Sequence, residues 1–169
     1  MRLLGAPCLI ALLVTVSAAA QPTPAGNAAI SQEQRITDAD RAIGALRAMN
    51  SAQASFKSAC GQGFYAPGLV ELAKPAVPGG EGFLTPALAT GASVTKDGYT
   101  FKMASSEDPV TTPNEACNGV PLVRGYYVTA TPVKGSGGQY FGTNTKGVIF
   151  HGNAPLKMTD LSADGTPIK

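Results

Sequence analysis

The hydrophobic residues of this chain change their spacing once, near residue 98. Between residues 39 and 59, apolar side chains recur three and four positions apart, which places them on one face of an amphipathic helix. After Asp97 and Gly98, apolar side chains alternate with polar ones, beginning at Tyr99. A long helix followed by alternating strands predicts an α+β domain, in which the helix packs on one face of an antiparallel sheet.

The predicted helix has clear start and stop signals. Ser31 with Gln34, and Thr37 with Asp40, both fit a capping box, in which side chains satisfy backbone N–H groups of the first turn. Gly61 follows the last residue of the pattern, where a helix commonly ends. The resulting helix is about 45 Å long, which is more than a domain of this size needs, so we expect its first turns to project.

Four runs after residue 98 are typical of strands. They predict about four antiparallel strands joined in sequence order as a meander. Residues 61–98 hold most of the turn-forming residues, with short helical turns expected near Leu69 and after Thr85 and Pro86. The four runs are residues 99–103, 126–131, 140–143 and 147–150.

The first twenty residues have the pattern of a secretory signal peptide. Arg2 precedes an apolar stretch, and small residues before Gln21 fit a cleavage site. The apolar stretch is shorter than a bilayer span, and the alternative is an uncleaved anchor. We therefore expect a periplasmic or secreted protein with no transmembrane span after cleavage. Its expected parts are a signal peptide at residues 1–20, a linker at 21–30 and one domain at 31–169.

Loss of the signal peptide removes Cys8 and leaves two cysteines, Cys60 and Cys117. In an oxidising compartment, an even pair predicts a disulfide. A metal or redox site fits the sequence less well, because there is no C-x-x-C motif and His151 is the only histidine. The predicted bridge joins the end of the helix to the long connection between the first two predicted strands.

Charge and motifs exclude several classes of function. The formal net charge is +2, and the 13 lysines and arginines are scattered with no two adjacent, so the clustered basic surface of a nucleic-acid-binding protein is missing. A catalytic histidine needs an orienting carboxylate and a nucleophile nearby, and the sequence names neither for His151. An atypical hydrolase, which would need His151 beside a serine or a carboxylate, is therefore a third hypothesis behind the two functions given below. No cofactor fingerprint occurs. We therefore predict no enzyme, no catalytic residues and no cofactor.

Five segments form an ordered set, at residues 45–59, 96–101, 125–132, 139–144 and 147–149. In that order they resemble segments of the type IV pilins and of the pseudopilins of type II secretion. Residues 45–59 are similar to the C-terminal half of their long helix, where a Leu-Arg-x-x-Asn-x-Ala-x-x-x-Phe pattern leads into a Gly/Tyr/Pro segment. The likeness covers roughly residues 35–155. The later segments resemble the strands of the family's headgroup, and they are residues 96–101, 125–132, 139–144 and 147–149.

The resemblance implies a pilin-like headgroup and an exported, non-catalytic role in protein contacts within the cell envelope. The expected partners are components of a type IV pilus or a type II secretion system. Residues 1–30 lack the family's prepilin-peptidase site and the apolar half-helix that follows it, so the resemblance implies the headgroup alone. Docking is expected at the first helical turns or at an exposed edge of the meander.

Calcium binding enters only through this resemblance, because some pseudopilins hold calcium in their C-terminal loops. Asp160 and Asp164 are the weak candidates, and they supply fewer ligands than an EF-hand loop requires. No other metal site is predicted.

The alternative function is a periplasmic module that binds a small peptide or sugar. In that case the loops at residues 61–98 and 104–122 would frame a pocket, with Tyr65, Phe83 and Tyr126 as the binding surface. A large pocket with converging polar groups would favour this alternative. A filled core without such a pocket would favour the interaction protein.

Overall fold

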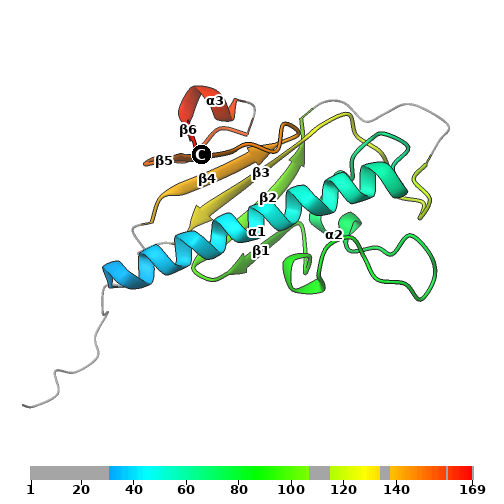
Figure 1. The fold of residues 1–169 in the computed structure, drawn as a ribbon, viewed down its shortest axis with the longest axis horizontal. Coiled ribbons are helices and arrows are strands. Elements are labelled where there is room, and N and C mark those ends of the chain that lie inside the picture. The colour runs from blue at the N-terminus through cyan, green and yellow to red at the C-terminus, as the bar shows by residue number, and fades with distance from the viewer. Residues whose placement is uncertain (1–30, 107–114, 134–137, 159, 169) are drawn as a thin grey trace, which may run out of the picture.

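The computed structural model describes residues 31–106, 115–133, 138–158 and 160–168. The predicted signal peptide and linker lie outside these residues. The fold is α+β, with one long helix and a six-stranded antiparallel sheet (Figure 1). Its elements are α1 (Gln32–Ala59), α2 (Leu69–Leu72), the 3-10 turn η1 (Pro86–Leu88), β1 (Ser93–Lys96), β2 (Tyr99–Ser105), β3 (Tyr126–Pro132), β4 (Tyr140–Asn144), β5 (Ile149–Gly152), α3 (Leu161–Asp164) and β6 (Thr166–Pro167).

Helix α1 begins at the first of the two predicted caps. The Ser31 side chain accepts a hydrogen bond from the Gln34 backbone N–H at 3.1 Å. The second candidate, Thr37, lies inside the helix, where its hydroxyl donates to the Glu33 carbonyl at 3.0 Å. A serine side chain thus satisfies a backbone donor that the first helical turn leaves unpaired, which fixes where the helix starts.

The strand count differs from the prediction of about four. All six strands pair antiparallel in sequence order, β1 to β6. The additional β1 offers only one buried residue, Val94, so its sequence shows no alternation to detect. It joins β2 through Asp97 and Gly98, whose φ angles of 48° and 76° fit a tight hairpin turn. The additional β6 has two exposed residues and therefore no hydrophobic signal at all.

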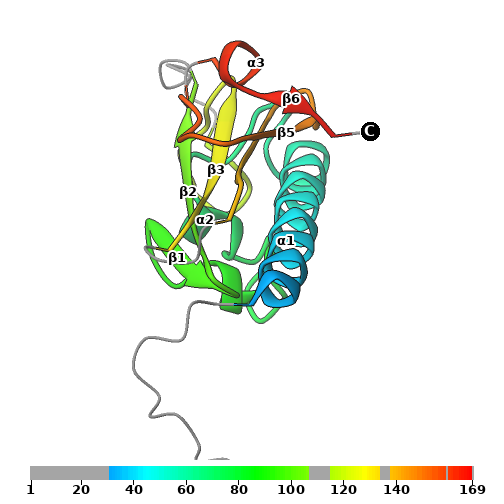
Figure 2. The ribbon, with the colours of Figure 1, turned by 90° about the vertical axis from the view of Figure 1, so that its left-hand side faces the viewer.

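Helix α1 lies along one face of the sheet, as Figures 1 and 2 show from two directions. The main core lies between these two layers. The opposite face of the sheet carries a smaller cluster of Phe150, Leu156 and Leu161, which packs near α3. The main core includes Leu46, Met49 and Phe56 from α1 and Phe101, Val128 and Phe141 from the sheet.

Two polar residues in the described ranges, Gln53 of α1 and Thr143 of β4, have no exposed surface. Gln53 lies within the main core. Its side-chain amide donates to the Ala66 carbonyl at 2.8 Å, and its oxygen accepts from the Ala66 backbone N–H at 3.0 Å. The same amide nitrogen lies 3.3 Å from the Met103 sulfur. Gln53 therefore supplies the hydrogen bonds that the buried segment at Ala66 would otherwise lack.

The disulfide predicted from the sequence is present between Cys60 and Cys117. Cys60 is the C-cap residue of α1, and Cys117 lies in the connection between β2 and β3. The Cys117 backbone N–H also donates to the Cys60 carbonyl at 3.1 Å. The bridge therefore joins the end of the helix to this connection, as expected. In the described ranges, no helix is both long enough and apolar enough to cross a membrane.

Adding a methyl group at Gly61 should destabilise the fold. A Cβ atom at this position would meet the Phe64 carbonyl oxygen and lie 2.8 Å from the Phe56 ring. Because Phe56 is fully buried and the other neighbour is backbone, neither can move away easily. We expect Gly61→Ala to lower the free energy of unfolding by about 2–3 kcal/mol, measured by urea denaturation.

The matched control for this change is Gly44→Ala on α1. Gly44 is exposed, and a Cβ atom there would meet nothing within 4 Å. Alanine in an exposed helix interior is more stable than glycine by about 0.5–1 kcal/mol, so the control should shift the urea midpoint upward. Equal midpoints for Gly61→Ala and the unchanged protein would contradict the close packing at Gly61.

Candidate functional site

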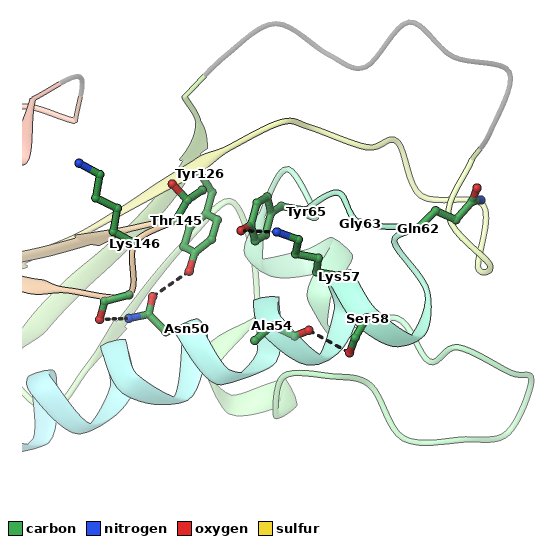
Figure 3. A pocket seen from close by; sticks show the side chains of 11 residues that line it. Asn50, Ala54, Lys57, Ser58, Gln62, Gly63, Tyr65, Tyr126, Thr145 and Lys146 are labelled. Carbon is green, nitrogen blue, oxygen red and sulfur yellow. Dashed lines mark hydrogen bonds between the residues drawn. The ribbon is translucent and has the colours of Figure 1, made fainter.

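The candidate site is an open cavity of about 600 Å³ beside the C-terminal half of α1. Residues from four parts of the chain line it: α1, the segment after it, β3 and the turn between β4 and β5. This volume lies within the range of small-molecule sites. The lining side chains used below are those of Asn50, Lys57, Ser58, Tyr65, Tyr126 and Lys146, which Figure 3 draws as sticks.

Asn50 links the elements at one end of this cavity through side-chain hydrogen bonds. Its side-chain amide donates to the Thr143 hydroxyl at 2.8 Å and to the Gly147 carbonyl at 3.2 Å. Its oxygen accepts from the Tyr126 hydroxyl at 2.9 Å (Figure 3). The Thr143 hydroxyl in turn donates to the Val148 carbonyl at 2.9 Å. A single helical side chain thereby connects α1 to β3, to β4 and to the β4–β5 turn.

Lys57, Tyr65 and Tyr126 form the other part of the cavity wall. The Lys57 ammonium donates to the Tyr65 hydroxyl at 3.0 Å and lies 4.6 Å from the centre of the Tyr65 ring. The Tyr65 and Tyr126 rings pack edge to face with their centres 5.1 Å apart. Tyr65 is positioned by paired backbone hydrogen bonds with Val123, of 2.9 and 3.0 Å. Backbone hydrogen bonds thus hold Tyr65 in place, and its side chain in turn contacts Tyr126 and Lys57.

The hydroxyls of two buried tyrosines resist ionisation. Burial first, and then the neighbouring Tyr65, raise the pKa of Tyr126 above its ordinary value of 10.0. Burial first, and then the charge of Asp38, raise the pKa of Tyr99 in the same direction. In the unfolded chain both groups would ionise near pH 10, so above that pH the folded state holds more protons than the unfolded state.

We expect this difference to make the fold lose stability in alkali. The contribution is complete below pH 10.0, the ordinary tyrosine pKa, and is lost as pH rises toward the folded pKa values. The loss should approach about 1.4 kcal/mol per pH unit for Tyr126, and Tyr99 adds to it in the same direction. Urea unfolding at a series of pH values measures it, and Tyr126→Phe should reduce the slope. An unchanged slope in this variant would contradict the assignment to Tyr126.

The structure brings together two of the three residues of the predicted binding surface. Tyr65 and Tyr126 both line the cavity. Phe83 does not: its ring packs edge to face on Phe56 at 5.4 Å, and it lines a different cavity of about 650 Å³ formed largely by residues 80–86. The prediction placed these three around one pocket framed by the loops at residues 61–98 and 104–122. In the structure, Phe83 packs on the core side chain Phe56 and lies away from the other two.

The two calcium candidates take part in local structure. Asp160 caps α3, where it accepts from the Ser162 hydroxyl at 2.8 Å and from the Ala163 backbone N–H at 3.0 Å. These bonds, the Ser162 bond first, lower the pKa of the Asp160 carboxyl. Asp164 lies 4.0 Å from the Lys157 ammonium. Among the described residues, no three His, Cys, Asp or Glu side chains gather as a metal site would require.

His151 lies on β5, where it pairs with Phe141 of β4 and Thr166 of β6. It is half-buried in the outer part of the sheet and is not among the residues that line the cavity.

Two residues of the cavity, Asn50 and Lys57, were not singled out as candidate site residues from the sequence. Both interrupt the apolar spacing of the helix. The partners of Asn50 follow much later in the chain, and the partner of Lys57 lies on a loop.

Comparisons of the chain with protein-family models, with curated proteins and with solved structures give no match.

Proposed function

We propose that this protein is an exported, non-catalytic interaction protein with a pilin-like headgroup, accessory to a type IV pilus or a type II secretion system. The observation that carries this proposal is the order of the elements. One long helix precedes a meander whose strands pair in sequence order, and the helix lies along one face of the sheet. The segments that resemble the family fall on α1, β2, β3 and β4 in the expected order.

Export is supported by the disulfide. Such bridges form and persist in oxidising compartments, such as the periplasm and the extracellular space. The amino-terminal pattern of residues 1–20 points the same way.

The first turns of α1 are the proposed docking surface. Ile36 is 55% exposed there. A hollow of about 450 Å³ lies beside it, between α1 and residues 138 and 139. An apolar side chain next to a hollow is the kind of feature that a partner helix fills.

Site-specific photocrosslinking tests this proposal in the source organism. A photoreactive amino acid at position 36 should give adducts with pilins, pseudopilins or their assembly proteins, identified by mass spectrometry. The matched control is position 102, because Lys102 is exposed on the sheet face opposite α1. Adducts from both positions alike, or none from position 36, would contradict docking through α1.

The second candidate function is a periplasmic ligand-binding module. The cavity of about 600 Å³ between α1 and the β4–β5 turn favours it, because polar side chains from several segments converge there. Native mass spectrometry of the protein purified after export tests this candidate. A retained small molecule supports the module, and bare protein from every preparation opposes it.

A further inference from the structure

The cavity beside α1 carries several hydrogen-bond donors. Among the residues that the structure describes, none that lines it is an aspartate or a glutamate, whereas two, Lys57 and Lys146, are lysines. In the part of the chain that the structure describes, the recorded ion pairs involve other cations, and Lys57 has none. A cavity of this composition favours a ligand that carries negative charge.

Counting donors shows where that charge would bind. The Asn50 amide is fully used, since both of its donated bonds go to the protein. The Ser58 hydroxyl donates to the Ala54 carbonyl at 3.1 Å. Lys57 donates one N–H to the Tyr65 hydroxyl oxygen. Since that oxygen accepts the bond, the O–H of Tyr65 can still donate. Gln62, Thr145 and Lys146 also carry donors in the lining. The two donors that a contact holds side by side are the Lys57 ammonium and the Tyr65 hydroxyl, 3.0 Å apart.

Three backbone N–H groups around the cavity are already hydrogen-bonded within the protein and are not free to hold a larger anion. Phosphate and sulfate are commonly held by a concave set of free backbone N–H groups. Here the N–H of Gly63 donates to the Lys57 carbonyl, and the N–H of Gly147 donates to the Asn144 carbonyl. The N–H of Lys146 donates to the Asn144 side chain. Two adjacent side-chain donors match the two oxygens of a carboxylate better than the several oxygens of a phosphate.

We propose that this cavity binds an organic carboxylate, with the Lys57 ammonium and the Tyr65 hydroxyl each donating to it. Tyr126 packs against Tyr65 and fixes its ring, so the hydroxyl is already positioned before binding. Lys146 extends away from Lys57 in Figure 3 and adds positive charge at the rim rather than a direct contact. The carboxylate comes from a peptide C-terminus or from a sugar acid. This inference rests on the second candidate function, the ligand-binding module.

Paired probes distinguish the charge from the rest of the ligand. N-acetyl-alanyl-alanine and its C-terminal amide form one pair, and glucuronate and methyl glucoside form the other. Each is titrated into the isotope-labelled, disulfide-bonded full chain, and binding is measured from the NMR shifts of the Gly63 and Tyr65 amides. We expect at least one acid to saturate with a Kd of about 1 mM or tighter, and its neutral partner to bind at least about tenfold more weakly.

Two variants test the assigned donors. Lys57→Met keeps the aliphatic stem and should weaken binding of the acid by about tenfold or more. Tyr65→Phe keeps the ring on Tyr126, and should weaken binding by a smaller factor. The matched control is Lys102→Met, which removes an exposed lysine on the opposite sheet face and should leave binding unchanged. Circular dichroism and the urea midpoint at neutral pH confirm that each variant is folded.

The possible outcomes distinguish failure of the carboxylate site from failure of the ligand-binding module on which it rests. Binding of an acid that Lys57→Met abolishes supports the carboxylate site, and the pair that responds identifies the source of the carboxylate. Equal binding of a neutral partner, or stronger saturation by inorganic phosphate, overturns the carboxylate while leaving a ligand-binding module in place. No saturation by any probe, together with bare protein in native mass spectrometry, overturns both.

Discussion

Replacing Cys117 with serine should lower the free energy of unfolding by about 4 kcal/mol. The bridge closes a ring between two residues 57 positions apart, and the unfolded chain without it gains the freedom that this closure removes. The loss has a local part as well. Cys60 is buried against the core, and the Cys117 sulfur lies 3.5 Å from the Ala76 carbonyl. For a domain of this size, such a loss is a large share of the net stability.

Urea denaturation of Cys117→Ser and of Cys60→Ser measures this contribution. Because the two cysteines act as one unit, the single variants and the double variant should unfold at nearly the same urea concentration. A reductant should destabilise the unchanged protein by a similar amount and should have no effect on the variants. A melting temperature of the unchanged protein that is indifferent to reductant would contradict the role of the bridge.

The second large effect is expected at Gln53. Replacing it with leucine keeps the approximate volume but removes the partners of the Ala66 N–H and carbonyl groups, which lie in the core. Each buried backbone group left without a hydrogen bond costs about 1–3 kcal/mol, and leucine recovers part of this through apolar contacts. We expect Gln53→Leu to lower the free energy of unfolding by about 3 kcal/mol.

Arg47→Leu is the matched control, since Arg47 is exposed on the same helix and leucine is as good a helix former. It should change the free energy of unfolding by less than about 0.5 kcal/mol. Hydrogen exchange gives a local readout, because the Ala66 amide should exchange faster in Gln53→Leu than in the unchanged protein. If Ala66 stays equally protected, another group satisfies it and the assignment to Gln53 is wrong.

The parts of this fold that local patterns encode could be predicted from the sequence. The three- and four-residue spacing of apolar side chains gave helix α1, and the Ser31 cap gave its start. Alternation gave strands β2 and β3, whose core-facing residues include Phe101 and Val128. The cysteine count gave the disulfide. The helix and the strands depend on residues that are close in sequence. The disulfide was predictable because only two cysteines remain after the predicted signal peptide, so only one pairing is possible.

The features that the sequence did not reveal depend on distant partners. Asn50 and Thr143 lie 93 positions apart, so nothing near Asn50 indicates that its amide is a contact with the sheet. The partner of Gln53, Ala66, is only 13 positions away. It lies on a loop, so no periodic pattern indicates that the two residues meet. Tyr65 and Phe83 belong to the same turn-rich region, and only the packing of Phe56 decides that Phe83 faces elsewhere.

The meander order also affects how fast the domain can assemble. Every strand pairs with the strand next to it in sequence. The pairs β1–β2, β3–β4 and β4–β5 can therefore form through short loop closures, whereas β2–β3 requires closure of the longer connection between those strands. Helix α1 is different, because it emerges first during synthesis while its Asn50 partners follow 93 and 97 residues later. The docking of α1 onto β4 and β5 therefore requires the longest closure in the fold. The part of the apolar face of α1 that packs on β3, β4 and β5 therefore stays uncovered until most of the domain has been made. Phe56, by contrast, can meet Phe83 much earlier.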